Sequence, residues 1–561
     1  MELEKAKDLF LTGTKLLTKK KFLEAIKYFE NSLEIIPDRP STLRNLLICY
    51  INLDDFENSK KYLKLLIINK SNDRDNLSLL INVFKKKELA KDLKDFIENI
   101  EEEIEIKQII KIQKDLIIPK LFKSEEQIKN IRQKLEKCVD EYLQNQNLEK
   151  HKLSNEILYS PKFNLSYDEY NNKNLFKKLT QLTRNIYPEL KIVDRKVKKI
   201  KNQKIKIGFI SEYLTDHTIG KLNFGLINKL NKKIFNVVIF HSSLTKKGLV
   251  LDNLIKLEKK GLIKNIFLSK FFEEGRIQIE KENLDILYFT DIGMSQDLYY
   301  YSYIKNANIQ LTSWGHPITT GNEAINYFLS SNLLETENSI SNYSEKLLLS
   351  KYLPMYFYKP QIKKKLGLGE MTNQNIYSCS QSLFKFHPKF DLILANILKK
   401  DKKAQIYLIK DINSILYPNL LDRFKNNNVI DLDRVSFLDP MNLEEFINFT
   451  GRSSVLLDPL FFGSGNSFHE SMFYGTPTVT LPTNYLKSRI VNGAYKQMKI
   501  ENPPVVSSEE DYVNLCIEIA NMDKNKTLDI KNYFKTQAEK FLFENIHFVD
   551  DFENIMKNLV N

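Results

Sequence analysis

Residues 204–211, KIKIGFIS, and residues 235–242, FNVVIFHS, decide the class of fold. Each is a short apolar run rich in Ile, Val and Phe, and the stretch between them has the apolar spacing of a helix. Strands that alternate with helices are typical of βαβ units, whose strands lie parallel in one sheet. We therefore predict that an α/β domain begins here.

The same alternation continues in two series. The first series adds LDILYFTD at 284–291, NIQLTSW at 308–314 and INYFLSS at 325–331. The second, which begins at Asn375, consists of NIYSCS, AQIYLIK, VSFLD, SVLLD and TPTVTLP. The segment YLPMYFYKPQIKKKLGLGE lies between the two series as a hinge. Two successive α/β domains predict a cleft, because open α/β sheets bind ligands beyond the carboxyl ends of their strands.

The first 100 residues predict helices only, because Gly and Pro are scarce and apolar residues recur at three and four spacing. FLEAIKYFENSLEIIPDR begins at Phe22 and FENSKKYLKLLIINKSND begins at Phe56, 34 residues later. This offset is the period of the tetratricopeptide repeat, with a third copy suggested near 75–105. A generic pair of helical hairpins is the alternative. The positions where that repeat has a small residue, a small residue and a proline are Gly13, Ala25 and Pro37.

We predict four regions from these patterns. A helical connector without a catalytic pattern is expected to pack on the first α/β domain. The regions are helical repeats at 1–105, the connector at 106–200, a first Rossmann-like domain at 201–360 and a second at 361–561.

The composition is that of a globular protein, with 42% hydrophobic and 28% charged residues among 561. No apolar run reaches 18 residues, and the N-terminus MELEKAKDLF has no signal-peptide core, so we expect no membrane span. The four cysteines form no CxxC pair, which argues against a zinc site and a disulfide framework and favours the cytoplasm. The net charge of +13 comes mostly from dispersed lysines, so we expect no nucleic-acid partner.

The stretch SVLLDPLFFGSGNSFHESMFYGTPTVTLP is the most informative about chemistry. A strand ends at Asp458, the glycine-containing loop Gly463–Ser467 follows, and a helix then carries Glu470. Glycines let the backbone approach a phosphate, and the amides at a helix start can donate to it. Glu470 could accept hydrogen bonds from ribose hydroxyls. The alternative is an ordinary loop in which Ser467 caps the helix.

Three other stretches follow predicted strands. His217, in KIKIGFISEYLTDHTIGKL, is a candidate general base or hydrogen-bond donor at neutral pH, or a structural histidine. Lys385, in SCSQSLFKFHP, could neutralise a diphosphate leaving group, or is one more surface lysine. The loop WGHPITTG, from Trp314 to Gly321, is unusually dense in Gly, Pro, His and Thr, with a turn capped by threonines as the alternative.

Together these stretches resemble the catalytic region of the O-linked N-acetylglucosamine transferase and SPINDLY family, glycosyltransferase family 41, in its bacterial repeat-bearing branch. The resemblance runs from about Lys204 to Arg489, with the repeats N-terminal to it. The motifs that carry it are, in order, IGFIS with DHTIGK, TDIGM, WGHPITTG with NYFLSS, YSEKL, QSLFKFHP and DPLFFGSGNSFHESMFYGTPTVTLP.

The resemblance implies the B-type glycosyltransferase fold and an inverting, metal-independent transfer of a sugar from a nucleotide donor to a protein. The donor implied is UDP-N-acetylglucosamine as substrate, with no cofactor, and the acceptor is Ser or Thr of a protein bound along the repeats. By motif match, His217 lies beside the donor sugar, Lys385 on the diphosphate, and Glu470 on the ribose. The other implied donor-binding residues are Gln381, Ser382, Gly465, Asn466, Ser467, His316, Pro317, Thr319, Thr320 and Gly321.

Two departures keep alternatives open. The family usually has Asp where this chain has Asn326, and that Asp has been proposed as a base. Phe446 falls near a His that helps to hold the nucleotide base in animal members. The alternatives are a donor such as GDP-fucose or UDP-glucose, transfer to Asn, and an adaptor with impaired catalysis. Asp431-Leu432-Asp433 is formally a DxD motif, which we predict to be a solvated turn without a metal.

Overall fold

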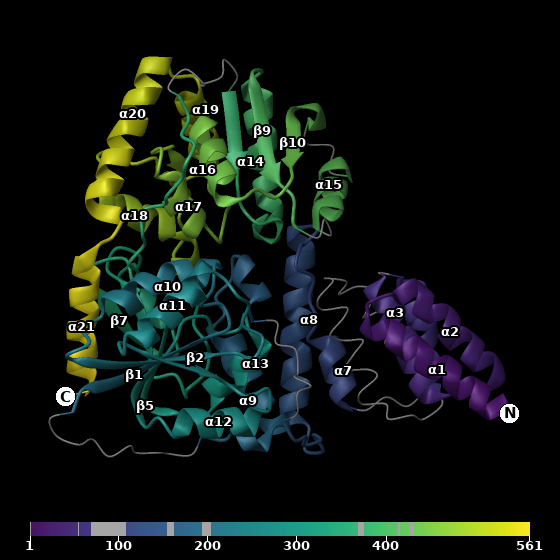
Figure 1. Cartoon of the computed structure of the whole chain (residues 1–561). Coiled ribbons are helices and arrows are strands. Elements are labelled where there is room, and N and C mark those ends of the chain that lie inside the picture. Colours follow the sequence, from purple (N-terminus) through teal and green to yellow (C-terminus); the bar gives the residue numbers. More distant parts are fainter. Residues whose placement is uncertain are drawn as a thin grey trace. The chain divides into compact units, whose positions relative to one another are not determined.

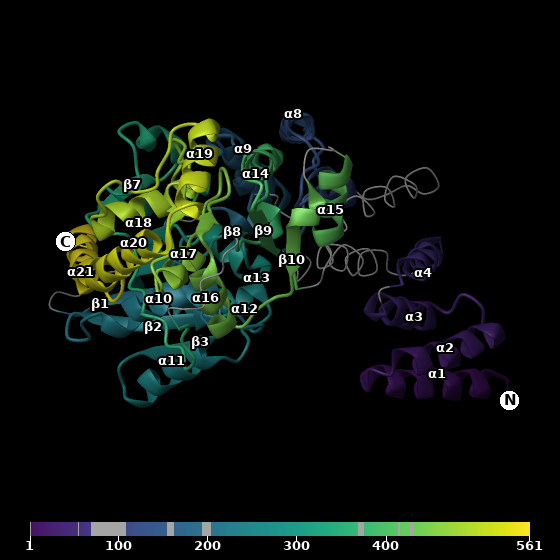
Figure 2. The same cartoon turned by 90° about the horizontal axis from the view of Figure 1, so that it is seen from above.

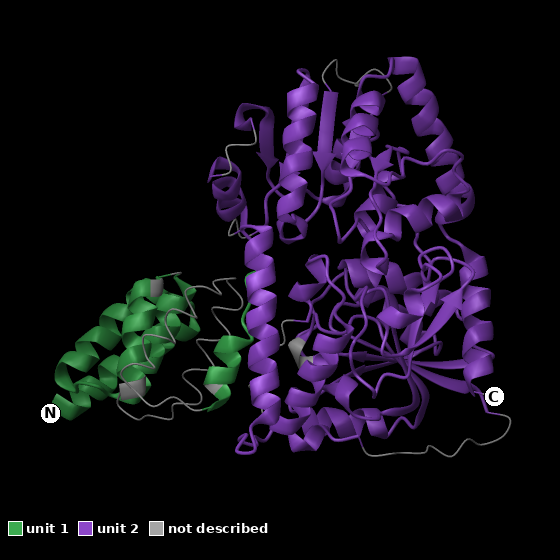
Figure 3. Ribbon diagram, turned by 180° about the vertical axis from the view of Figure 1, so that it is seen from behind, with its two compact units in different colours: residues 1–119 green, residues 120–561 purple. Residues whose placement is uncertain are grey.

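The structure is a computed structural model. It describes residues 2–53, 55–68, 108–153, 162–192, 203–367, 375–412, 416–426 and 431–560. The chain divides into two compact units, residues 1–119 and residues 120–561 (Figure 3). Within the described ranges, no helix is both long and apolar enough to cross a membrane.

The described residues of the first unit form helices and no strand, as predicted. Helices α2 and α4 begin 34 residues apart, at Phe22 and Phe56. Helices α1 and α2 pack so closely that a Cβ at Gly13 would lie 2.7 Å from the ring of Phe29. The tetratricopeptide identity of this unit stays a prediction, and its suggested third copy lies outside the described residues. The helices are α1 (Glu2–Thr18), α2 (Phe22–Ile35), α3 (Pro40–Asn52), α4 (Phe56–Ile68) and α7 (Gln108–Asp115).

The second unit contains two parallel sheets (Figures 1 and 2). The strand order is β3-β2-β1-β4-β5-β6-β7 in the first sheet and β10-β9-β8-β11-β12 in the second. The strands of the first sheet are β1 (Ile205–Ser211), β2 (Phe235–His241), β3 (Lys264–Phe267), β4 (Leu284–Phe289), β5 (Ala307–Ser313), β6 (Tyr327–Ser331) and β7 (Lys346–Ser350). Those of the second are β8 (Asn375–Cys379), β9 (Ala404–Ile409), β10 (Val435–Leu438), β11 (Val455–Leu457) and β12 (Thr478–Val479).

Both sheets have the Rossmann-like order, in which the chain starts in the middle, moves to one edge and then returns to the other side. The predicted α/β class with two Rossmann-like domains is therefore confirmed. All ten predicted strand runs contain a strand. The analysis of the sequence did not identify β3 and β7, which add to the first sheet.

Helices cover both sheets. The connector contributes α8 (Glu125–Gln144), the short helix η1 (Asn164–Tyr167) and α9 (Lys173–Ile186). The helices of the first series are α10 (Thr218–Lys229), α11 (Leu249–Lys259), α12 (Phe272–Glu280) and α13 (Gln296–Tyr299). Those of the second are α14 (Pro388–Lys400), α15 (Leu416–Asn426), α16 (Leu443–Arg452), α17 (Asn466–Ser471), α18 (Ile490–Met498), α19 (Glu509–Ala520), α20 (Lys524–Gln537) and α21 (Ile546–Val560).

The C-terminal helix α21 returns to the first sheet. Phe548 and Phe552 are buried in the same hydrophobic cluster as Ile207 of β1 and Ile286 of β4. In Figure 1 this helix runs beside β1 and β7. The chain therefore crosses back from the second sheet to the first, which ties the two α/β halves together by burial of apolar surface.

Candidate active site

The candidate residues follow the central strands of the two sheets. His217 follows β1, the neighbour of β4, and Lys385 follows β8, the neighbour of β11. These neighbouring strands mark the point where the connections change sides, which is where open α/β sheets bind ligands. The two halves meet here, since Lys221 of α10 forms an ion pair of 2.7 Å with Glu470 of α17. Helices α10 and α17 lie side by side in Figure 1.

Asp458, directly after β11, holds the glycine-containing loop in place. Its Oδ1 accepts from the backbone N–H of Ser464 at 2.6 Å, and its Oδ2 accepts from the Thr480 hydroxyl at 2.7 Å. A Cβ at Gly463 would lie 2.9 Å from the same carboxylate, so the loop needs glycine there. Burial raises the pKa of Asp458 to about 6. The loop is thus fixed by the protein itself.

The start of α17 has no side-chain cap of its own. Gly465 is the N-cap, so the alternative that Ser467 caps the helix is not what the structure shows. The hydroxyl of Ser467 instead accepts from the Gln381 side chain. Asn466 has a buried Oδ1 without a hydrogen-bond partner. An unpaired buried polar atom costs about 1–3 kcal/mol, so it indicates a place where a ligand group is expected.

Lys385 is built into this loop. Its Nζ donates to Gln381 Oε1 at 2.8 Å and to the carbonyl of Gly463 at 3.1 Å, and it lies 4.9 Å from the centre of the Phe462 ring. Burial lowers the pKa of Lys385 to about 8, an effect that the nearby Asp458 opposes. Lys385, Gln381 and Ser467 therefore form one connected set of polar groups. Ser382 begins the short helix that carries Lys385, and it is exposed.

His217 is the N-cap of α10. Its Nδ1 accepts from the backbone N–H of Ile219 at 3.3 Å, and its ring lies against Tyr213. Burial, together with the charge of Lys221, lowers the pKa of His217 to about 4. The ring is therefore neutral at pH 7 and carries its proton on Nε2, because Nδ1 acts as an acceptor.

The WGHPITTG loop is held by a buried carboxylate. The hydroxyl of Thr319 donates to Glu345 Oε2 at 2.7 Å, and both the hydroxyl and the backbone N–H of Thr320 donate to Glu345 Oε1. Gly321 has a φ of +65°, and a Cβ there would lie 2.4 Å from the backbone of Phe176. These three residues fix the loop. The threonine hydroxyl protons are directed to Glu345, and the expectation that the two residues bind the donor stays a prediction.

His316, in the same loop, is 1% exposed, and neither of its ring nitrogens has a hydrogen-bond partner. Burial lowers its pKa to about 3, so the ring is neutral. The ring of Phe163 stacks on it with centroids 5.4 Å apart. A neutral imidazole has one donor and one acceptor, so both remain to be paired with a ligand.

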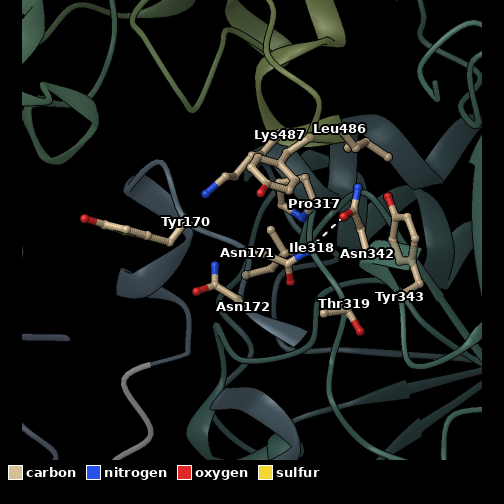
Figure 4. Close-up of a pocket in the computed structure, with 11 residues that line it drawn as sticks. Tyr170, Asn171, Asn172, Pro317, Ile318, Thr319, Asn342, Tyr343, Leu486 and Lys487 are labelled. Carbon is tan, nitrogen blue, oxygen red and sulfur yellow. Dashed lines mark hydrogen bonds between the residues drawn. The ribbon is translucent and has the colours of Figure 1, made fainter. Parts of the chain in front are cut away.

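A small hollow, with about 20 Å³ of accessible space, opens beside this loop (Figure 4). Connector residues form one wall, and Asn171 donates to Asn342 across it at 2.9 Å. The charge of Lys487 is paired with the buried Asp168, so the lining is close to neutral. The lining residues are Tyr170, Asn171, Asn172, Pro317, Ile318, Thr319, Asn342, Tyr343, Tyr485, Leu486 and Lys487.

Asp291 was not among the residues predicted for the site, although it stands in the motif TDIGM. It follows β4, is 8% exposed and accepts a hydrogen bond of 2.7 Å from the hydroxyl of Thr290. Burial raises its pKa to about 7. An acidic residue directly after a central strand was the signal that could have identified it.

Asn326 lies elsewhere. It precedes β6, and its Oδ1 accepts from the backbone N–H of Gln310 at 2.9 Å and from Lys305 Nζ at 3.0 Å. Gln310 is three residues before the end of β5, and a strand rises about 3.3 Å per residue. Asn326 is therefore about 10 Å below the strand ends that carry the site.

The predicted DxD turn is exposed, and Asp431 bonds Arg434 at 2.8 Å. Among the described residues, no group of three or more His, Cys, Asp or Glu side chains could hold a metal ion.

Comparison with known proteins agrees with the resemblance that the sequence motifs indicate. No family model matches the chain. A protein of Arabidopsis thaliana described as a probable UDP-N-acetylglucosamine–peptide N-acetylglucosaminyltransferase SEC is 21% identical over 341 residues, which are 57% of this chain and 33% of that protein. The chain thus matches about a third of that relative's length. A mutant of the O-GlcNAc transferase of Thermobaculum terrenum has a TM-score of 0.70 at 15% identity, over 100% of this chain and 98% of that one.

The two Rossmann-like domains, whose loops after the carboxyl ends of the strands meet, have the B-type glycosyltransferase fold. In sequence and in fold, the chain resembles the O-linked N-acetylglucosamine transferase and SPINDLY family.

Proposed function

We propose that this chain is a glycosyltransferase that moves N-acetylglucosamine from UDP-N-acetylglucosamine to a Ser or Thr hydroxyl of a protein. The observation that carries the proposal is the set Lys385, Gln381 and Ser467 at the start of α17, opposite the neutral His316 and His217. The first set suits a diphosphate, and the second suits an uncharged sugar. The Arabidopsis relative, by its description, acts on UDP-N-acetylglucosamine and peptide.

In the proposed reaction, the acceptor oxygen attacks the anomeric carbon of the sugar. The bond from that carbon to the β-phosphate oxygen breaks, its electron pair stays on UDP, and the acceptor proton is transferred to a base. Lys385 and the backbone amides at Asn466 and Ser467 stabilise the charge that develops on UDP. Because Lys385 supplies the positive charge, we expect the rate to be independent of divalent cations.

The tautomer of His217 favours a role in orienting the substrate. Its Nδ1 already accepts from Ile219, so Nε2 presents a proton and cannot accept one. Asp291 is the better candidate for the base, because its pKa of about 7 lies near the operating pH.

The contacts of Asn326 weaken the case for an impaired adaptor. An Asp at this position would lie at the far end of β6 from the proposed site, where it would bond Gln310 and Lys305 as the Asn does. Its replacement by Asn therefore removes no group from the proposed site.

A nucleotide screen followed by a transfer assay tests the proposal. The full chain is heated with UDP, GDP, UDP-N-acetylglucosamine, UDP-glucose or GDP-fucose, because a ligand at about 100 times its Kd adds about 2.7 kcal/mol of stability. We expect stabilisation by UDP and its N-acetylglucosamine ester, and hydrolysis of the latter that EDTA leaves unchanged. Stabilisation by GDP alone would show that the donor is a GDP-sugar and not UDP-N-acetylglucosamine. A chain that binds every nucleotide poorly and releases no sugar would contradict the proposal that it is an enzyme.

Intact-protein mass spectrometry of candidate acceptors, coexpressed with and without this chain, then identifies the acceptor. The added mass gives the sugar, and fragmentation gives the modified residue. Modified Asn in place of Ser or Thr would favour the alternative acceptor chemistry. Binding of the acceptor along the helical repeats and a cytoplasmic location remain predictions.

A further inference from the structure

The connector segment 162–172 contacts the loops that follow both sheets. Its short helix η1 is almost entirely buried, although no catalytic pattern is found in this part of the sequence. Charged side chains anchor the segment in the second α/β half: Asp168 pairs with Lys487, and Glu169 Oε2 lies 3.1 Å from His387 Nε2. Asp168 also pairs with Arg132 of the connector helix α8. The segment is thus tied to the fold at several points.

On the side of the first sheet, the segment supports the WGHPITTG loop. The ring of Phe163 stacks on His316, with an angle of 27° between the ring planes. Lys162 is buried beside it, and its Nζ donates to the carbonyl of Thr320 at 3.1 Å and to Thr180 at 2.7 Å. Because neither ring nitrogen of His316 makes a hydrogen bond, packing is what fixes the orientation of this ring.

On the side of the second sheet, Tyr167 packs against the surroundings of Lys385. Its ring centroid lies 4.8 Å from that of Phe384 and 4.8 Å from that of Phe462. Phe384 precedes Lys385 in sequence, and the Phe462 ring lies beneath its Nζ. Tyr167 and Phe163 also touch each other, edge to face, with centroids 5.6 Å apart.

These contacts form one continuous series of rings. It runs from His316 through Phe163 and Tyr167 to Phe462 and Lys385. Aromatic rings are rigid and have few torsions, so such a series transmits a fixed spacing better than flexible side chains do. The direct ion pair between Lys221 and Glu470 also joins the halves, but it depends on a long, partly exposed lysine.

We propose that Phe163 and Tyr167 are positioning residues, which set the separation and orientation of His316 relative to Lys385. This rests on the proposed function, in which His316 lies at the donor sugar and Lys385 at the diphosphate. The series then aligns the anomeric carbon with its leaving group while touching neither. A misplacement of about 1 Å in such an alignment can cost about 10²-fold in rate.

The test compares two Phe→Leu variants of the full chain. Phe163→Leu removes the ring that stacks on His316, whereas Phe235→Leu makes the same change in the core at the beginning of β2, where Phe235 is 1% exposed. The measurements are the melting temperature, the Kd of UDP by calorimetry, and kcat and KM for hydrolysis of UDP-N-acetylglucosamine. A role in packing alone would lower the melting temperature of both variants and leave kcat of the folded protein unchanged.

We expect Phe163→Leu to keep the Kd of UDP within about threefold, because the second α/β half binds the diphosphate, and to lower kcat by about 10- to 100-fold. Phe235→Leu should keep both values. A Phe163→Leu variant with the kcat of the natural chain would overturn the positioning proposal and leave the proposed function intact. A natural chain that binds no nucleotide would remove both.

A second pair keeps the proposal testable if Phe163→Leu does not fold. Tyr167→Phe keeps the ring between Phe163 and Phe462, and Tyr167→Leu removes it. We expect the Phe variant to turn over within about threefold of the natural chain and the Leu variant to lose about tenfold or more. Equal kcat values in the two variants would contradict the proposal.

Discussion

The two halves of the candidate site differ in what occupies their polar groups. In the half built on the second sheet, Lys385 and Asp458 are each held by two hydrogen bonds within the protein. In the half built on the first sheet, the buried His316 has none. One half is therefore held by the protein in an arrangement that suits a charged group, whereas the other leaves a buried neutral ring without a hydrogen-bond partner.

Asn466 is an exception in the charged half, because its buried Oδ1 has no partner. It lies at the first position of α17, next to the loop that Asp458 holds. The proposed donor would satisfy it. A preorganised frame with one open contact is what a site needs if it is to bind without rearrangement.

Replacement of Lys385 is expected to have the largest effect on the rate. Lys385→Met keeps the length of the side chain and removes the charge, and loss of one preorganised donor typically costs about 10²–10³ in rate. Its Nζ also makes two hydrogen bonds within the protein, so its loss should lower the melting temperature as well. Single-turnover kinetics with UDP-N-acetylglucosamine and a thermal melt measure the two effects.

Lys531→Met is the matched control. Lys531 is also buried with a pKa lowered to about 8, but its Nζ donates to the carbonyls of Gly451 and Ser453 at the end of α16. Its loss should lower the melting temperature and leave kcat of the folded protein unchanged. Comparable kcat losses in both variants, or full activity of Lys385→Met, would refute the assignment of charge to the second half.

The pH dependence of kcat/KM tests the half of the site that is built on the first sheet. Burial raises the pKa of Asp291 to about 7 and lowers that of Lys385 to about 8. We therefore expect kcat/KM to rise as Asp291 loses its proton and to fall again above about pH 8 as Lys385 loses its charge. His217, with a pKa of about 4, stays neutral throughout and contributes nothing to the rise. Asp291→Asn should remove the rise and lower kcat by about 10²–10⁴.

Stability checks the cause of this pKa independently of activity. Because the folded state holds the Asp291 proton more tightly than the unfolded state, its contribution to stability is present below pH 4 and is lost as the pH rises to about 7. Asp291→Asn should therefore be more stable relative to the natural chain at pH 8 than at pH 5. A kcat/KM rise that survives in the Asn variant would assign the base to another group.

Sequence patterns predicted several parts of the site that follow a strand after a short loop. His217, Lys385 and the loop at Gly465 each do so, and parallel order brings strand ends together. The pattern could not show that Thr319 and Thr320 donate to Glu345, because that contact joins segments 25 residues apart. In the structure the two threonines hold the loop, and their contact with the donor stays a prediction.

The connector was missed for the same reason. Phe163 and Tyr167 stand in an irregular, aromatic-rich stretch with no motif, and their partners lie more than 150 residues away. Periodicity reports which face of an element is buried but not which loop covers it. The two edge strands of the first sheet, β3 and β7, were also not predicted.

The smallest effect is expected at Asn326, and it tests whether catalysis depends on this position. Asn326→Asp restores the residue that the family usually has, and a carboxylate can accept the same hydrogen bonds from Gln310 and Lys305. Because the position lies about 10 Å below the strand ends, kcat should stay within about twofold and stability within about 0.5 kcal/mol. Steady-state hydrolysis and a denaturant melt measure both. A rise in kcat of tenfold or more would place a base at this end of β6 and favour the impaired adaptor for the natural chain. An unchanged rate would leave Asp291 as the candidate for the catalytic base.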